Sequence, residues 1–226
     1  MPDADRATAD PDAALRDRIM VFNLAPVRYV HPSWYDAAEG GEGMRALAGA
    51  PALQRAISAT LLERFGLDRA FATEFSEPRA RLALLDRPLL ESLLLYVGAA
   101  LRSDALRAVL DGRRLAYLRR EIGSGALDYA IRRAPLSGPI PAFALEPSEE
   151  SMRVTLLRIG AAFSLSPEAV GDPAYMRRVG LMLPRRAGVA LAEDLPHPDA
   201  PEGRALPPLV RRILKEFSPL WLPFFD

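Results

Sequence analysis

The segment from Arg87 to Leu101 constrains the fold of this chain more than any other stretch. Asp86 is placed to cap a helix there, and Pro88 falls in the first turn, where the amide hydrogen that proline lacks has no helical partner to lose. The segment is apolar on nearly every side, so a helix formed by it does not suit a surface with one face in water. We therefore predict a helix over these residues at the centre of the fold.

Other segments carry apolar residues at the spacing of amphipathic helices. Leu53, Ile57, Leu61 and Phe65 form one stripe, and Gly66 is placed to end that helix. The stripe indicates core packing. The further predicted helices are residues 13–22, 104–110, 113–122 and 125–133, a helix capped by Ser148 with its stripe from Met152 to Phe163, two short helices after Ser166 and Asp172, and residues 209–217.

No stretch of four or more residues alternates as a half-buried strand would. The predicted fold class is therefore mainly α, a single compact multi-helix domain with proline-rich connectors and no substantial sheet. Residues 39–43 are predicted to form a loop, and residues 135–147, with four prolines, an extended connector. The predicted organisation is a disordered acidic leader (1–12), a helical body (13–194), a proline-rich linker or arm (195–208), and a C-terminal amphipathic helix with an apolar tail packed on the body (209–226).

The residue types that enzymes and metal sites need are scarce in this sequence. There is no cysteine, and the two histidines, His31 and His197, lack the spacing of zinc ligands. Gly123-Ser124-Gly125 lacks the spacing of a nucleophile elbow and is predicted to form a turn. No phosphate-binding glycine loop is present. We therefore predict no catalytic residue, no cofactor and no metal, with His31 in a structural role and His197 exposed.

Charge and hydropathy limit the partners of the chain. The 29 basic and 29 acidic residues balance, which argues against nucleic acid as a partner. The longest apolar run, Leu93 to Leu101, is far shorter than the roughly 20 residues of a spanning helix, so no direct membrane insertion is predicted. The acidic start is unlike a signal peptide. These features predict a cytoplasmic protein that binds other proteins.

One part of the chain carries a local excess of arginine. Residues 102–133 hold eight arginines against four acidic residues, a local charge of +4. One interpretation is a solvated helix face. The other is a patch for carboxylates on another protein, since the arginine fork pairs with them in a bidentate way. The candidate interaction residues are Arg113, Arg114, Arg119 and Arg120.

Aromatic residues gather near both ends of the chain. Trp34 and Tyr35 lie near the start, and Trp221, Phe224 and Phe225 lie close to the C-terminus. Chain ends normally fray, so large apolar residues there must either dock on the core or be buried by a partner. We expect the C-terminal residues to dock, and keep all five as candidate interaction residues because aromatics recur in interface hot spots.

The segment from Phe22 to Trp34 resembles the opening of the YscK/PscK (SctK) proteins of bacterial type III secretion. The resemblance rests on Phe22-Asn23-Leu24, Pro26, Tyr29-Val30-His31 and Trp34. It covers most of residues 19–220, and the acidic leader, residues 39–43 and the tail 221–225 depart from it. The later segments that are similar to the family are Leu53–Leu67, Leu89–Leu101, Leu127–Pro141 and Pro207–Phe217.

This resemblance implies an adaptor of the type III secretion sorting platform. Such an adaptor resides in the bacterial cytoplasm and is recruited to the cytoplasmic face of the inner membrane by the secretion machine. It would join the cytoplasmic domain of the inner-membrane ring protein (YscD type) to the pod protein (YscQ type), near the stator (YscL type) and the secretion ATPase. The alternative is a helical chaperone or regulator that holds a secreted client protein.

Overall fold

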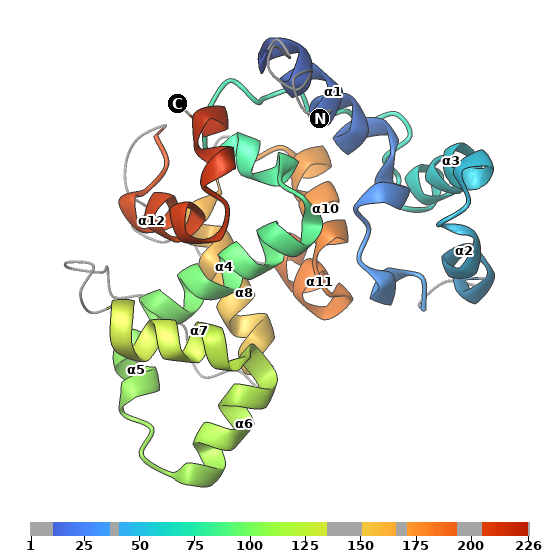
Figure 1. The fold of residues 1–226 in the computed structure, drawn as a ribbon. Helices are drawn as coiled ribbons and strands as arrows, with labels where there is room; N and C mark the ends of the chain where they lie inside the picture. The colour runs from blue at the N-terminus through green and yellow to red at the C-terminus, as the bar shows by residue number, and fades with distance from the viewer. Residues whose placement is uncertain (1–10, 37–40, 135–150, 166–170, 194–204, 226) are drawn as a thin grey trace, which may run out of the picture.

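The computed structural model describes residues 11–36, 41–134, 151–165, 171–193 and 205–225. These residues form helices and connecting turns, with no strand among them (Figure 1). The prediction of a mainly α fold is confirmed. No helix in this described part of the chain combines the length and the apolar character that crossing a bilayer requires.

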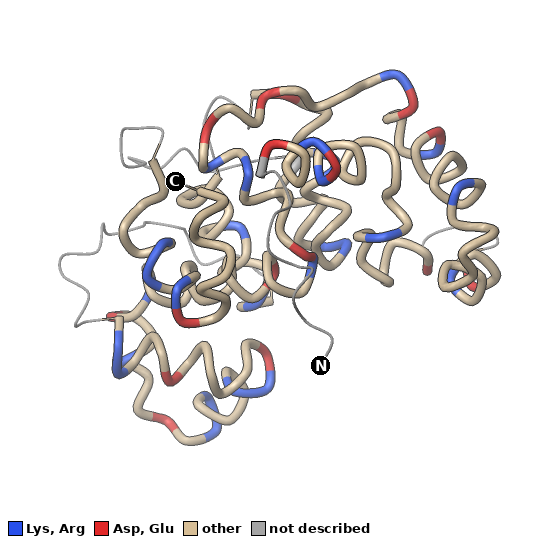
Figure 2. Tube along the Cα trace, turned by 45° about the horizontal axis from the view of Figure 1, so that its top comes forward, with Lys and Arg blue, Asp and Glu red and all other residues tan. Residues whose placement is uncertain are grey.

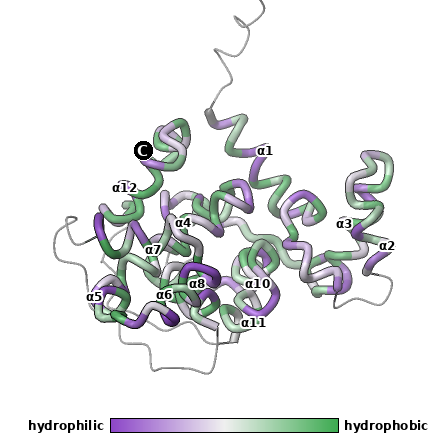
Figure 3. Tube along the Cα trace, turned by 60° about the horizontal axis from the view of Figure 1, so that its bottom comes forward, coloured by the Kyte–Doolittle hydropathy of each residue, from purple (hydrophilic) through white to green (hydrophobic). Residues whose placement is uncertain are grey.

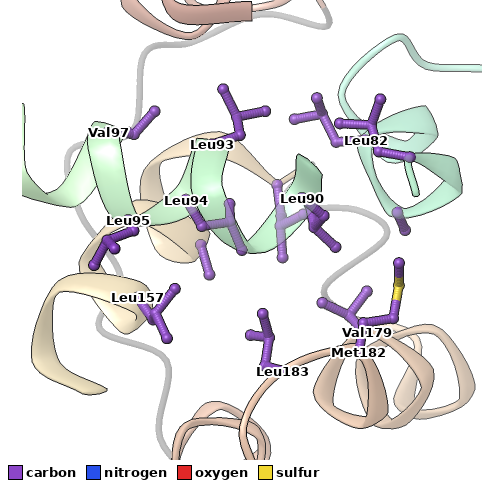
Figure 4. Packing of buried hydrophobic residues seen from close by; sticks show 14 of the residues in the cluster. Leu82, Leu90, Leu93, Leu94, Leu95, Val97, Leu157, Val179, Met182 and Leu183 are labelled. Atoms are coloured by element: carbon purple, nitrogen blue, oxygen red, sulfur yellow. The ribbon is translucent and has the colours of Figure 1, made fainter. Parts of the chain in front are cut away.

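Two antiparallel helices form the centre of the fold. Helix α4 (Arg87–Leu101) has the predicted bounds and packs along α8 (Met152–Ser164) in the most extensive helix contact of the structure. Leu90, Leu93 and Val97 are fully buried. Figure 4 shows side chains from α4, α8 and α10 (Pro173–Met182) meeting in this core. The prediction of a central helix is confirmed, although the Asp86 side chain makes no capping hydrogen bond.

Paired glycines let α4 and α8 come into backbone contact. A Cβ atom at Gly98 would overlap the carbonyl oxygen of Leu156, and one at Gly160 would overlap that of Leu94. The two contacts are reciprocal because the helices run in opposite directions. Any larger residue at position 98 or position 160 would hold the two helices further apart.

The N-terminal segment is tied to the core by backbone-directed hydrogen bonds. It begins with α1 (Pro11–Leu24), near whose end the Asn23 side-chain amide donates to the carbonyl of Ala72 and accepts from the amide of that residue, both at 2.9 Å. The Tyr29 hydroxyl donates to the Phe22 carbonyl at 2.7 Å. The elements that follow are η1 (Pro26–Arg28), η2 (Pro32–Trp34), α2 (Gly41–Leu47), η3 (Pro51–Leu53), α3 (Gln54–Arg64) and η4 (Ala80–Leu84).

Two arginines are fully buried in this region. Arg79 donates from Nη2 to the Phe163 carbonyl at 2.8 Å and from Nε to the Ser164 carbonyl at 3.2 Å, so it satisfies the C-terminal end of α8. Arg178 of α10 joins three segments through backbone carbonyls. Nothing in the local sequence distinguishes these two arginines from the exposed ones.

A separate group of short helices lies beyond the C-terminal end of α4. Gly123, with φ of 83°, separates α6 (Gly112–Ile122) from α7 (Ser124–Asp128). The predicted helix 104–110 is shorter in the structure and ends at Arg107, and the predicted helix 125–133 divides into α7 and the π-helical η5. The elements of this group, here named the α5–α7 lobe, are α5 (Ser103–Arg107), α6 (Gly112–Ile122), α7 (Ser124–Asp128) and η5 (Tyr129–Arg133).

Other predicted boundaries need correction. The loop prediction for 39–43 is wrong at its end, because α2 begins at Gly41 and Met44 packs against the core. Helix α8 is capped by the Ser151 hydroxyl, which accepts from the amide of Val154, whereas we predicted Ser148. The structure also contains α11 (Arg185–Glu193), which we did not predict from the sequence.

Some predictions fall outside the described residues. These are most of the acidic leader, the connector 135–147, the residue Ser148 itself, the short helix after Ser166, His197 and most of the arm 195–208. The structure describes the C-terminal region from residue 205, where α12 (Pro208–Phe217) is followed by η7 (Pro219–Phe225).

Candidate protein-interaction site

Helix α6 presents its arginines on the side away from the core. The Asp111 carboxylate caps the helix by accepting from the amides of Arg113 and Arg114, each at 3.2 Å. Leu118 and Ile122 are buried on the inner face. The four candidate arginines are all exposed and are two pairs of consecutive residues. They are here named the α6 arginine face: Arg113, Arg114, Arg119 and Arg120.

The charge of the α6 arginine face is not matched by nearby carboxylates. Within the described residues, none of its four guanidinium groups forms an ion pair, whereas Arg133 pairs with Glu216 at 2.7 Å. Arg120 lies 5.8 Å above the ring of Tyr117, a weak cation–π contact. Figure 2 shows charged residues spread over the whole molecule. What distinguishes α6 is that four exposed arginines without an ion pair among the described residues lie on one short helix.

An apolar groove lies beside these arginines. It has a volume of about 550 Å³ and runs between α5, the turn 108–111, α6 and the start of α8. Leu110 lies at this groove with 89% of its surface exposed, and Tyr117 is 41% exposed. Figure 3 shows hydrophobic and hydrophilic residues side by side in this lobe. The residues that line the groove, here named the α5–α6 groove, include Leu106, Val109, Leu110, Tyr117, Leu118 and Met152, with Arg102 and Arg114 among them.

We did not predict this groove from the sequence. A signal for it exists, since two large apolar residues, Val109 and Leu110, directly precede the turn residues Asp111 and Gly112. Turns normally carry polar residues, so an apolar pair at a turn indicates that these side chains are covered either by the core or by a partner.

Trp34 and Tyr35 belong to the contact between the N-terminal segment and α10. The Trp34 indole N–H donates to the Leu183 carbonyl at 3.0 Å, and its ring packs edge to face on Phe65 with centroids 5.3 Å apart. Tyr35 is buried, with 4% of its surface exposed. In this structure Tyr35 is therefore not accessible to a partner, and Trp34 is accessible only in part.

The C-terminal aromatic residues contact the N-terminal half of the same chain. The guanidinium of Arg18 lies 4.0 Å above the Trp221 ring, and Arg81 donates to the Phe224 carbonyl at 3.1 Å. Phe225 is buried, whereas Trp221 and Phe224 remain half-buried. These contacts attach η7 to α1 and η4.

The candidate residues do not form a single site. The α6 arginine face lies in the α5–α7 lobe, Trp34 and Tyr35 lie beside α10 and α11, and the C-terminal residues lie against α1 (Figure 1). Among the candidate residues in the described part of the chain, only those of the α6 arginine face combine full exposure, unmatched charge and an adjoining groove. It is the surface best suited to a protein partner.

The strongly perturbed titratable groups have structural roles. Burial raises the pKa of Tyr29 and of Tyr175, whose hydroxyls donate to the carbonyls of Phe22 and Ala80. Burial also lowers the pKa of Arg178. No group of three His, Asp or Glu residues that could hold a metal ion occurs in the described ranges. The absence of a catalytic centre remains a prediction.

His31 caps η2 and should make stability depend on pH. Its Nδ1 atom accepts from the Ser33 amide at 3.2 Å, which requires that nitrogen to be unprotonated, and burial lowers its pKa below 6.5. The unfolded chain therefore binds this proton more readily, so the free energy of unfolding should fall as the pH drops through and below 6.5. We expect the free energy of unfolding of His31→Asn, which keeps an acceptor, to fall less between pH 7.5 and 5.5 than that of the unaltered chain, as measured by urea denaturation. Equal pH dependence in both proteins would contradict this role.

Comparison with known proteins identifies one family. The family model described as YOP proteins translocation protein K (YscK) matches residues 19–219. The match includes the central helix pair, the α6 arginine face and Trp34, and it ends before Trp221, Phe224 and Phe225. Neither the curated proteins nor the solved structures contain a match to the chain.

Proposed function

This chain belongs to the YscK family and is a type III secretion protein, and on that premise we propose that it is an adaptor of the secretion sorting platform. It would link the cytoplasmic domain of the inner-membrane ring protein (YscD type) to the pod protein (YscQ type). The stator (YscL type) and the secretion ATPase would lie nearby. The adaptor would act in the bacterial cytoplasm and be recruited to the membrane face by the machine.

The observation that carries this proposal is the α6 arginine face. Four exposed guanidinium groups without ion pairs among the described residues can pair with carboxylates of another protein, and such charge pairs favour both specificity and association rate. The close backbone contact of α4 and α8 supports the proposal further. A rigid body holds two binding surfaces at a fixed separation, as an adaptor must.

Charge reversal on α6 tests the proposal. We expect Arg113→Glu, Arg114→Glu, Arg119→Glu and Arg120→Glu together to weaken binding to the ring or to the pod protein by tenfold or more, as measured in pull-downs and titrations of purified proteins. Binding of the unaltered chain should weaken with added salt. All four side chains are exposed, so the melting temperature should change little.

A matched control carries the same change of charge elsewhere. Four other exposed arginines, on α11 and α12, are Arg185, Arg186, Arg211 and Arg212. Reversal of these four should leave the interaction made by α6 intact. Undiminished recovery of every platform protein by the α6 variant would contradict the proposal. Recovery of a single secreted client, with neither ring nor pod protein, would favour the chaperone alternative.

A further inference from the structure

We propose that the α5–α6 groove binds the apolar face of an acidic amphipathic helix from a protein partner. This inference deepens the proposed function, and rests on it for the expectation that the helix belongs to a component of the secretion machinery. The occupant follows from three properties of the site: its apolar lining, the exposed leucine at it, and the charge around it.

The lining suits the apolar side chains of a helix. Buried Leu106 and Leu118 lie within it, and Val109 and Met152 contribute further apolar surface. A volume of about 550 Å³ lies within the range of pockets that enclose drug-sized ligands, and so has room for more than one side chain. Helices bind such grooves through large apolar residues spaced three and four positions apart.

Leu110 is the least covered part of this surface. It is 89% exposed and lies directly before the α6 cap, on the same groove as the 41% exposed Tyr117. Single exposed leucines are common on proteins, but here the exposed side chain lines the same groove as an aromatic ring and buried apolar residues. Coverage by a partner would remove all three from water, which gives the groove a favourable hydrophobic contribution to binding.

The charge of the surroundings selects an acidic helix. Arg114 lines the groove, and Arg113, Arg119 and Arg120 of the α6 arginine face are on the same short helix. The nearest acidic side chain of the lining, Asp111, already accepts two amide hydrogens of α6. A helix with Asp or Glu beside its apolar stripe would therefore meet arginine, whereas a basic helix would be repelled.

Two synthetic peptides test the groove without any platform protein. Both are helical with leucine at every third or fourth position. One carries glutamate and its twin carries lysine at the remaining positions. Each is titrated into the full-length chain by fluorescence anisotropy. We expect the glutamate peptide to bind, the lysine twin not to bind, and added salt to weaken binding.

Two leucine variants form a matched pair. Leu110→Ala should weaken binding of the glutamate peptide about tenfold, because a leucine side chain covered by the helix is lost. Leu220→Ala should not, since Leu220 is 91% exposed and lies in η7, away from the groove. Arg114→Gln should also weaken binding and reduce its dependence on salt. Both leucines are exposed, so neither variant should change the melting temperature.

Several results would overturn the inference. These are no binding of the glutamate peptide, equal binding by the Leu110→Ala and Leu220→Ala proteins, or equal binding of the lysine twin. A photo-crosslinker at position 110 that reacts only with residues 135–150 of the same chain, or with a second copy of it, would also overturn it. If the peptide behaves as expected but ring and pod proteins do not bind, the groove stands and the adaptor proposal fails. If both proteins bind the Leu110→Ala chain normally and the peptide does not bind, the adaptor stands and the groove fails.

Discussion

Replacement of Arg178 with methionine should lower the free energy of unfolding by about 3 kcal/mol. The guanidinium is fully buried and donates from Nη1 to Ala174 at 3.2 Å and from Nη2 to Asn23 and Leu67 at 3.2 and 3.1 Å, in each case to the carbonyl oxygen. Methionine fills much of the space but donates no hydrogen bond. The carbonyls at the end of α1 and after α3 would be left buried without this donor, at a cost of about 1–3 kcal/mol each.

The neighbouring residue provides the control for this change. Arg177 lies one position earlier on α10 and is exposed. Its replacement by methionine should alter stability by less than about 0.5 kcal/mol in urea denaturation. Arg178→Lys should lie between the two, because a single ammonium group cannot reproduce the geometry of the guanidinium fork. If both methionine variants lose the same stability, Arg178 does not hold these segments together.

Substitution of the glycines at the contact between α4 and α8 should lower the free energy of unfolding nearly as much as Arg178→Met. Gly98→Ala and Gly160→Ala should each destabilise the fold by about 2–3 kcal/mol, because the added methyl group meets a backbone oxygen of the facing helix and not the end of a flexible side chain. The helices must then separate, which loosens the packing of Leu93 and Leu157 in the core (Figure 4).

A double variant and an exposed glycine sharpen this test. Once one alanine has moved the helices apart, the second should cost less, so the effect of Gly98→Ala with Gly160→Ala should be smaller than the sum of the single effects. Gly43 in α2 has no atom within 4 Å of an added Cβ, so Gly43→Ala should stabilise by about 0.5–1 kcal/mol. Full additivity of the two core variants would show that they do not share one contact.

Features that depend on nearby residues were predictable. The bounds of α4 agree with the prediction, and the end of α3 follows from Gly66, whose φ is 62°. Asp172 caps α10 by accepting from the Ala174 amide at 2.8 Å, as its position before Pro173 predicts. In each case the signal and its structural effect lie within one helical turn of each other, so periodicity and capping rules apply directly.

The candidate site was predictable only in part. The exposure of the α6 arginines follows from the apolar face of their own helix, on which Leu118 and Ile122 are buried. The burial of Tyr35 and Phe225 does not follow from local patterns, because it depends on elements that are distant in the sequence. The α5–α6 groove likewise needs Met152, which is far along the chain from α6.

The sequence by itself determined where most of the helices lie, which face of those helices is apolar, and that the residues of common catalytic and metal sites are scarce. Only the tertiary structure decided which exposed charges lack partners, which of the described arginines are buried, and where an apolar surface stays open to water. The physical reason is that helix formation is settled over one or two turns, whereas burial depends on the distant segments that pack around a residue. For Arg178 and Leu110, both in locally ordinary contexts, that packing leads to opposite results.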